Sequence, residues 1–388
     1  MTSEAQAARG RIEWTRRRMP LLSSVGRQFS QTRPFEGLRI AFRLHVEPKT
    51  AVLLEALQAG GAEVEVLGNQ GTTQFGTAEV LRSSGLAVLD EPGDDARTTA
   101  TKVGHLASSN PDLVLDNGAE VIAAVIEAGS ALRGATEETT SGAFLLREEY
   151  DARVPFPVVV INDSPLKSLV ENKHGVGESV IDTVTRVTNL ALHRLRVIVF
   201  GYGWCGRGIA LYAARRGAAV EIVEPDELKA LEATMDGFRV VEGADLGAAQ
   251  LVVTATGRDD VIATEQLTSL SDGAILANAG HTDREIDVAG FRSLGPVERL
   301  APSIERVRTG DGRELFLLAE GRTINLAAQG GLGNPIQAMD MGLTLQARSL
   351  EALALGRVSP LGPQPVPDAV DREVARAFRR TLERGESA

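Results

Sequence analysis

The chain has little cysteine and little histidine. Its 388 residues include one cysteine, Cys205, and five histidines. A single thiol excludes a disulfide within the chain and is typical of a reducing, cytoplasmic compartment. These few residues are not spaced as metal ligands are, so no metal site is predicted.

Long hydrophobic runs and an excess of positive charge are also absent. No apolar run approaches the ~20 residues of a membrane-spanning helix, and the polar N-terminus lacks the apolar segment of a secretory signal. The net charge of −11 argues against nucleic acid as a partner. With 43% apolar residues, the composition is typical of a globular protein that needs neither a membrane nor a nucleic acid.

Strand-like and helix-like segments alternate along the chain. The apolar segments "RIAFR", "EVEVL", "DLVLDNG" and "FPVVVIND" are separated by stretches such as "TAVLLEALQAGG" and "EVIAAVIEAG". The rhythm returns in "RVIVFG", "AAVEIVEPD", "LVVTATG" and "GAILANAG". Alternation of this kind predicts parallel sheets with helices on both faces. We therefore expect an α/β protein with two doubly wound domains.

The domain boundaries are predicted from the same pattern. Residues 1–176 are expected to form the first domain, to which a late helix at 335–353 returns. Residues 177–334 form the second, entered through a long helix from Glu178 to His193. Residues 354–388 read as a Pro-rich linker followed by a short charged C-terminal helix.

The stretch "VFGYGWCGRGIA" carries a G-x-G-x-x-G pattern at Gly201, Gly203 and Gly206. Gly201 permits a tight turn, Gly203 lets the backbone approach a pyrophosphate, and Gly206 lets the helix pack on the strand. Glu224 ends the next strand, where a carboxylate binds a ribose 2′-hydroxyl and repels a 2′-phosphate. The pattern predicts a Rossmann domain that binds NAD, inserted before a returning C-terminal helix. A glycine-rich turn without a ligand is the alternative.

Several further motifs carry a family resemblance. "INDSPLKSLVENKHGVG" follows, with one change, the pattern N-D-S-x-x-K-x-x-x-D-N-x-x-G. Together with "LHVEPKT", "ATEETTSG", "GYGWCGRGIA", "VTATG", "NAGHTDREID" and "LAEGRTINLAA", it resembles the S-adenosylhomocysteine hydrolase family, in its shorter bacterial and archaeal branch. The resemblance covers nearly the whole chain up to residue 353.

The resemblance implies a reaction in which NAD is not consumed. The first domain would hold a nucleoside, and a hydride would pass from the ribose 3′-carbon to tightly bound NAD. The resulting ketone acidifies the C4′ hydrogen, whose loss expels the group on C5′; in the hydrolase, water then adds. Family members are generally tetramers, so a homo-oligomer is expected.

The resemblance also implies roles for individual residues. Lys167 would be the base beside the 3′-hydroxyl, and Glu138 would bind ribose hydroxyls, as would Glu171. His45 and His281 match two histidines that line the reaction cleft, with His45 a candidate for proton transfer at the C4′/C5′ end. Without the family, "EETT" would read only as a helix cap.

The remaining matches are expected to bind rather than react. Those on the cofactor side, besides the glycine turn and Glu224, are Thr139, Thr140, Ser141, Asn172, Thr256, Gly280 and Asn325. Those on the substrate side are Glu47, Lys49, Thr50, Asp116 and Asn334.

Four departures from the family pattern suggest a change of chemistry. Asn117 replaces the second of two aspartates and cannot exchange a proton at neutral pH. Glu171 replaces an aspartate, and Asn334 replaces the histidine of G-H-P in a loop two residues longer. The family's C-terminal extension is cut short at Ala388. The departures predict a divergent nucleoside dehydratase or lyase of the nucleoside-antibiotic type. The alternatives are a genuine S-adenosyl- or S-inosylhomocysteine hydrolase, or a non-catalytic NAD-binding homologue.

Overall fold

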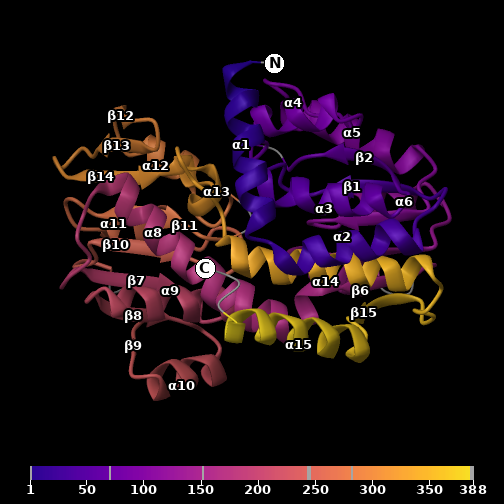
Figure 1. Cartoon of the computed structure of the whole chain (residues 1–388). Coiled ribbons are helices and arrows are strands. Elements are labelled where there is room, and N and C mark those ends of the chain that lie inside the picture. Colours follow the sequence, from indigo (N-terminus) through magenta and orange to yellow (C-terminus); the bar gives the residue numbers. More distant parts are fainter. Residues whose placement is uncertain (1, 70, 151–152, 243–245, 281–282, 385–388) are drawn as a thin grey trace. The chain divides into compact units, whose positions relative to one another are not determined.

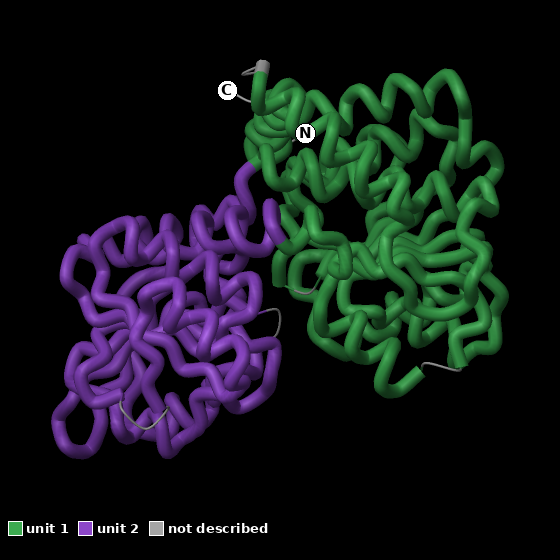
Figure 2. Tube along the Cα trace, turned by 90° about the horizontal axis from the view of Figure 1, so that it is seen from below, with its two compact units in different colours: residues 1–168, 336–388 green, residues 169–335 purple. Residues whose placement is uncertain are grey.

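The chain forms two compact units, each with its own sheet (Figures 1 and 2). The structure is a computed structural model that describes residues 2–384 apart from 70, 151–152, 243–245 and 281–282. Unit 1 comprises residues 1–168 and 336–388, and unit 2 comprises residues 169–335. The sequence placed the first boundary at 176, whereas the units divide at 168, within a π-helix that spans Lys167–Val176 (η4).

Unit 1 is built on seven parallel strands in the order β15-β6-β5-β4-β1-β2-β3. The strands are β1 (Arg39–Arg43), β2 (Glu63–Leu67), β3 (Ala87–Val88), β4 (Leu113–Asp116), β5 (Gly134–Glu137), β6 (Pro157–Val160) and β15 (Gly362–Pro365). The helices are α1 (Ser3–Arg17), α2 (Pro20–Thr32), α3 (Pro48–Ala59), α4 (Phe75–Ser83), α5 (Ala96–Ser108), α6 (Glu120–Glu127), α7 (Thr140–Leu145), α14 (Ile336–Ala354) and α15 (Asp368–Arg384), with the shorter turns η1 (Leu146–Tyr150) and η3 (Ile161–Asp163). The central strands are buried on both faces, which is why they read as continuous apolar runs.

Unit 2 has an eight-stranded sheet in the order β12-β13-β14-β11-β10-β7-β8-β9. The strands are β7 (Arg196–Phe200), β8 (Ala219–Val223), β9 (Arg239–Val240), β10 (Leu251–Thr254), β11 (Ile275–Asn278), β12 (Val297–Ala301), β13 (Ile304–Arg308) and β14 (Glu314–Leu318). The helices are α8 (Gly177–Thr188), α9 (Trp204–Arg215), α10 (Glu227–Met235), α11 (Thr264–Ser269), α12 (Val288–Ser293) and α13 (Ile324–Ala327), with the turn η5 (Ala319–Gly321). Strands β12, β13 and β14 pair antiparallel and extend an otherwise parallel sheet.

The core of unit 2 shows that helices cover both faces of its sheet. Along β7, Val197 and Val199 belong to one apolar cluster, while Ile198 and Phe200 belong to another. Successive strand residues point to opposite faces, so each face has its own core. The predicted α/β fold with doubly wound sheets is confirmed.

Each sheet also has a point where the strand order reverses. In unit 1 the chain runs outward through β1, β2 and β3 and then returns to place β4 beside β1. In unit 2 it runs through β7, β8 and β9 and returns to place β10 beside β7. Ligands of doubly wound sheets bind outside the carboxyl ends of the strands at such points. The loops that follow β1, β4, β7 and β10 are therefore where binding residues are expected.

Two details of the predicted elements are wrong. The helix expected to reach His193 ends at Thr188, because Asn189 adopts a left-handed conformation with φ of 54° and closes it. The expected Pro-rich linker contains β15, which pairs with β6 at the edge of the sheet. An edge strand tolerates prolines because one side of its backbone needs no ladder partner.

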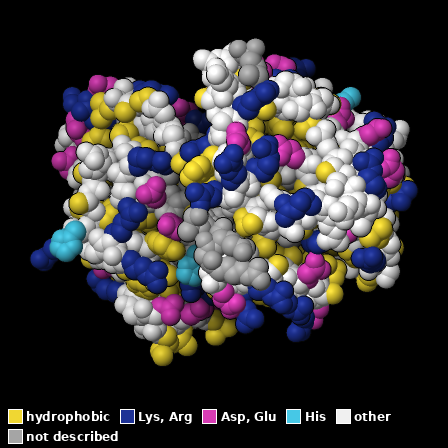
Figure 3. All heavy atoms as spheres, viewed as in Figure 1, with side chains coloured by type: hydrophobic (Ala, Val, Ile, Leu, Met, Phe, Trp, Pro, Cys, Tyr) yellow, Lys and Arg dark blue, Asp and Glu magenta, His cyan; other side chains and the backbone are white. Residues whose placement is uncertain are grey.

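The surface shows charges of both signs. On the face drawn in Figure 3, acidic and basic side chains are interspersed rather than gathered by sign. None of the described helices combines the length and the apolar content that a membrane span requires.

Candidate functional site

The loops at the carboxyl ends of β1, β2, β4 and β5 bring polar side chains together in unit 1. Glu138 follows β5 directly and is only 5% exposed. Lys167 Nζ lies 2.8 Å from Glu138 Oε1, and Asn117 Nδ2 donates to Glu138 Oε2 at 2.8 Å. Burial by itself raises the pKa of Glu138, but Lys167 and Asn117 outweigh it and leave that pKa below its ordinary value. Glu138 is thus an ionised acceptor held between two donors.

Asn69, which the sequence analysis did not single out, fixes the amide of Asn117. Its Nδ2 donates to Asn117 Oδ1 at 2.5 Å, so the Asn117 amide presents its nitrogen to Glu138. Asn69 lies in the loop after β2, a strand that neighbours β1. The signal that could have found it is a polar residue just beyond a strand that ends beside the reversal point.

His45, after β1, has a defined tautomer. Its Nδ1 lies 2.9 Å from Thr72 Oγ1, and the Thr72 hydroxyl donates to the backbone oxygen of Asn69 at 2.8 Å. A hydroxyl has a single hydrogen, so Nδ1 is the donor in its contact with Thr72. The neutral ring then carries its lone pair on Nε2, the nitrogen at which His45 can take up a proton. Thr72 was also missed by the sequence analysis.

The segment that follows His45 contains a buried ion pair. Lys49 Nζ lies 2.7 Å from Glu47 Oε2, and both side chains are less than a tenth exposed. Burial raises the pKa of Glu47, with Lys49 opposing the shift. Thr50 Oγ1 donates to the backbone oxygen of His45 at 2.7 Å and accepts from the Glu47 amide, so it holds the turn that carries these side chains.

Asp116 is fully buried and its oxygens are taken up by backbone donors. It accepts from the amides of Asn117, Val121 and Ile122 at 2.8–2.9 Å and thereby caps the start of α6. Burial raises its pKa to about 6. These contacts support a scaffolding role for the residue that the sequence placed on the substrate side.

The hydroxyl residues predicted for the cofactor side lie at the start of α7. Thr139 caps this helix by accepting from the Gly142 amide at 2.9 Å, and Ser141 Oγ lies 3.2 Å from Thr139 Oγ1. Thr140 Oγ1 accepts from Asn162 Nδ2 at 3.0 Å. The helix-cap interpretation of "EETT" is therefore correct for Thr139.

The π-helix η4 carries three further predicted residues. It begins at Lys167 and contains Glu171, which is 4% exposed, and Asn172, which is partly buried. His281 lies outside the described residues.

In unit 2 the glycine turn has the form that dinucleotide binding requires. Gly201 has φ of 93°, and a Cβ on Gly206 would lie 1.9 Å from the backbone oxygen of Gly201. No atom of the described residues lies within 4 Å of the Cβ position of Gly203, at the cap of α9. Glu224 accepts from the amide of Tyr202, within this turn, at 2.6 Å. A helix N-terminus with open space in front of it and an acidic residue beside it fits a pyrophosphate and an adenosine ribose.

Asn325 supplies a second observation that fits the cofactor. It is 4% exposed, and its Nδ2 donates to Ser179 Oγ at 2.8 Å and to Asn334 Oδ1 at 3.3 Å. Among the described residues, its Oδ1 has no hydrogen-bond partner. A buried acceptor without a donor is costly, so this atom suits a ligand N–H such as that of a carboxamide. Asn334, predicted at the substrate entrance, lies against Asn325 and Ser179.

A buried carboxylate holds the loops of Thr256 and Gly280. Glu285 is fully buried and accepts from Thr256 N and Oγ1 at 3.0 Å and from Gly257 N at 2.8 Å. A Cβ on Gly280 would lie 1.6 Å from Glu285 Oε1, so only glycine fits there. The motif "NAGHTDREID" contains Glu285 but predicted no role for it.

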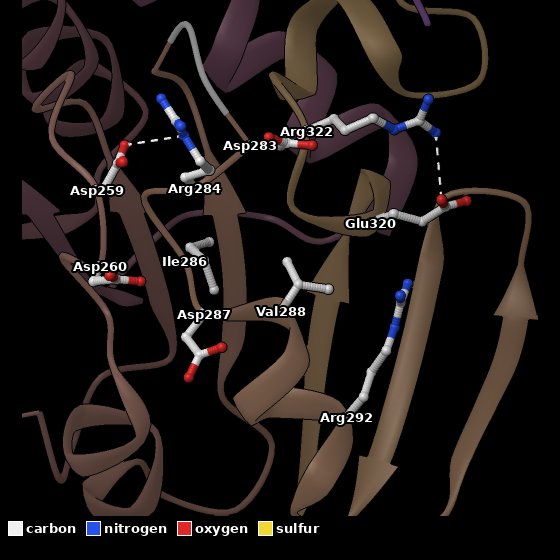
Figure 4. A pocket seen from close by; sticks show the side chains of 10 residues that line it. All are labelled: Asp259, Asp260, Asp283, Arg284, Ile286, Asp287, Val288, Arg292, Glu320 and Arg322. Carbon is white, nitrogen blue, oxygen red and sulfur yellow. Dashed lines mark ion pairs between the residues drawn. The ribbon is translucent and has the colours of Figure 1, made fainter. Parts of the chain in front are cut away.

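Unit 2 also contains a polar pocket of about 440 Å³ (Figure 4). Ion pairs between Arg284 and Asp259 and between Arg322 and Glu320 cross part of it. None of the described residues that the sequence predicted for the site lines this pocket.

Together, the fold and these loops define an NAD-binding α/β protein whose other unit carries a lysine–carboxylate–histidine site. A model of the S-adenosyl-L-homocysteine hydrolase family matches residues 2–131, and one of that family's NAD binding domain matches residues 172–331. The chain belongs to the S-adenosyl-L-homocysteine hydrolase family, and its predicted cofactor, NAD, is confirmed.

Relatives of this chain are similar over almost their whole length. The S-inosyl-L-homocysteine hydrolase of Methanopyrus kandleri is 41% identical over 385 residues, which cover 96% of this chain and 90% of the relative. The adenosylhomocysteinase of Archaeoglobus fulgidus is 40% identical over 375 residues, which cover 94% and 92%. That of Thermotoga maritima is 38% identical over 379 residues, which cover 94% and 92%.

Proposed function

We propose that this protein is an NAD-dependent hydrolase that cleaves an S-nucleosyl-L-homocysteine, with adenine or hypoxanthine as the base, into homocysteine and the nucleoside. The observation that carries the proposal is the ionised Glu138 carboxylate held between Lys167 and Asn117, with His45 on a neighbouring loop. A carboxylate with an ammonium beside it suits two adjacent ribose hydroxyls, one bound and one deprotonated.

In unit 1, Glu138, Lys167 and His45 each have a separate role in the reaction. Glu138 accepts a hydrogen bond from a ribose hydroxyl and orients the ring. Lys167 first gives its ammonium proton to solvent, and as the neutral amine it then takes the proton that leaves the 3′-oxygen. When bound, NAD supplies the acceptor for the C3′ hydride and returns the hydride at the end of the cycle. His45, with its lone pair on Nε2, moves the proton at the C4′/C5′ end when homocysteine leaves and when water adds.

The residues of unit 2 hold the cofactor. The α9 N-terminus binds its pyrophosphate, Glu224 binds its adenosine ribose, and the Asn325 Oδ1 accepts from its carboxamide. Ser179 and Asn334 accept hydrogen bonds from the Asn325 nitrogen. These bonds fix the orientation of the amide and leave its oxygen for the cofactor.

The comparisons support this hydrolase alternative better than the dehydratase that the sequence analysis favoured. The relatives named above are all hydrolases of this kind. Asn117, the main argument for the dehydratase, forms hydrogen bonds on both sides of its amide and so has a positioning role compatible with hydrolysis.

The test is to supply the NAD-loaded protein with S-adenosylhomocysteine or S-inosylhomocysteine, together with a thiol-trapping reagent, and to identify products by mass spectrometry. Release of homocysteine with adenosine or inosine supports the proposal and selects the base. The variant Lys167→Met should lower NADH formation by at least about 100-fold. A product lighter by one water from a nucleoside with a free 5′-hydroxyl, without thiol release, would establish the dehydratase. Bound NAD that no nucleoside reduces would establish a non-catalytic homologue.

A further inference from the structure

Glu137 is a buried carboxylate at the candidate site to which neither the motifs nor the proposed mechanism gives a role. It is the last residue of β5 and has no exposed surface. Its partner in the sheet register is Asp116, the last residue of β4. The two strands that end here are followed immediately by Asn117 and Glu138.

The Glu137 carboxylate binds both of the turns that carry these residues. From the turn after β4 it accepts the Gly118 amide at 3.0 Å and the Ala119 amide at 2.8 Å. From the turn after β5 it accepts the Thr139 amide at 2.7 Å and the Thr139 hydroxyl at 2.6 Å. Three of these donors converge on Oε1 and the Ala119 amide reaches Oε2, so the carboxylate is held from both turns.

The start of α7 leaves only the space that this carboxylate needs. A Cβ on Gly142 would lie 2.3 Å from both Cδ and Oε1 of Glu137. Any larger residue at position 142 would therefore displace the carboxylate or the helix. Gly142 and Glu137 together form one tightly packed unit beneath the turn that carries Glu138.

We propose that Glu137 is a positioning residue for ribose oxidation: it fixes the separation of the Asn117 amide and the Glu138 carboxylate by binding both turns. The inference rests on the proposed function, because the role of Glu138 does. Glu137 touches neither of these two side chains in its hydrogen bonds and acts through the backbone of their neighbours. A glutamine at 137 would turn an N–H₂ donor toward backbone donors and so release one of the turns.

The test is single-turnover NADH formation in the NAD-loaded protein after addition of the nucleoside substrate. Glu137→Gln is expected to slow this step about 100-fold, because a shift of about 1 Å in the position of a reacting group can cost that much in rate. NAD affinity, measured by equilibrium dialysis, should fall by less than about tenfold, because Thr139, which Glu137 holds, is only one of the residues predicted for the cofactor side.

A double-mutant cycle with Glu138→Gln separates positioning from general weakening of the fold. If Glu137 acts through Glu138, adding Glu137→Gln to Glu138→Gln lowers the rate by no more than about threefold further. A rate that falls by the product of the two single effects would overturn the inference. Where Glu137→Gln does not fold, Gly142→Ala, which displaces the same carboxylate, is put through the same cycle and decides by the same criterion.

Asp340 offers a matched control within unit 1. It is also a buried carboxylate that accepts two backbone amides, those of Leu21 and Leu22 at the start of α2. Asp340→Asn should leave the rate of NADH formation within about twofold. Equal rates for Glu137→Gln and Asp340→Asn would overturn the inference alone, whereas a wild-type protein that forms no NADH with either nucleoside would overturn the proposed function and this inference with it.

Discussion

Asn117 places a neutral amide beside the Glu138 carboxylate. Asn117 donates to Glu138 and accepts from Asn69, so it adds no charge of its own. Lys167 and the Asn117 amide together keep the pKa of Glu138 low despite complete burial. Glu138 therefore faces a neutral amide here, whereas an aspartate at position 117 would place a second acidic group beside it.

Asn117→Asp should therefore move the pH dependence of ribose oxidation. A second carboxylate 2.8 Å from Glu138 raises the pKa of the pair, by about one unit or more. A rate that needs ionised Glu138 is present above this pKa and is lost as the pH falls through it, so the acid limb of the rate profile should shift to higher pH. Single-turnover NADH formation measured across pH provides the check.

The matched control for this substitution is Asn117→Ser, which removes the amide donor without adding charge. Its acid limb should shift less than that of Asn117→Asp. Superimposable acid limbs for the wild type and Asn117→Asp would show that Glu138 is not the group whose ionisation the oxidation requires.

At the scale of elements, two glycines of the strand–turn–helix unit β7–α9 have different surroundings and therefore different roles. The Cβ position of Gly206 meets the Gly201 backbone oxygen at 1.9 Å, within the protein itself. That of Gly203 meets no atom within 4 Å in the part of the chain that the structure describes. Gly206 is therefore needed for packing, whereas Gly203 keeps space open for a ligand.

The two alanine variants should separate folding from cofactor binding. Gly206→Ala is expected to lower the free energy of unfolding by about 1–3 kcal/mol, because backbone must move to admit the methyl group. Gly203→Ala should cost less than about 1 kcal/mol, since it changes only the cap of α9. It should nevertheless weaken NAD binding about tenfold or more, because its methyl group enters the space left for the pyrophosphate.

Thermal denaturation without NAD and equilibrium dialysis with NAD measure these two quantities. A Gly203→Ala variant that binds NAD as the wild type does would mean that the cofactor does not approach this turn closely.

The sequence allowed some of these elements to be predicted and hid others. The glycine turn is local, so the spacing of Gly201, Gly203 and Gly206 after an apolar strand was sufficient to predict the turn between β7 and α9. Asn69 acquires its role only through Asn117, 48 residues away, and Glu137 only through backbone amides of two different turns. Contacts of this kind depend on strand register, which no pattern within one segment reports. The prolines of β15 concealed a strand because only an edge position makes them acceptable.

At the scale of the whole molecule, each unit contains its own core and one of the two tryptophans. Trp14 lies on α1 in unit 1, and Trp204 lies in the first turn of α9 in unit 2. Both are partly exposed, at 49% and 42%, so replacing either with phenylalanine should perturb packing little. The variants Trp14→Phe and Trp204→Phe thus leave one fluorescent reporter in unit 2 and in unit 1, respectively.

NAD should stabilise unit 2 more than unit 1, because unit 2 contains the glycine turn and Glu224, whereas unit 1 contributes only Thr139, Thr140 and Ser141 to the predicted cofactor side. A ligand that binds only the folded state at about 100 times its Kd adds ~2.7 kcal/mol, which for a unit of this size raises Tm by about 5–10 °C. The transition reported by Trp204 should move by this amount, and that reported by Trp14 by less than about 2 °C. NADP is the matched control, because its 2′-phosphate would meet the Glu224 carboxylate and it should shift the Trp204 transition less. One common transition that NAD moves equally for both reporters would show that the units unfold together, and that NAD stabilises unit 1 as much as unit 2.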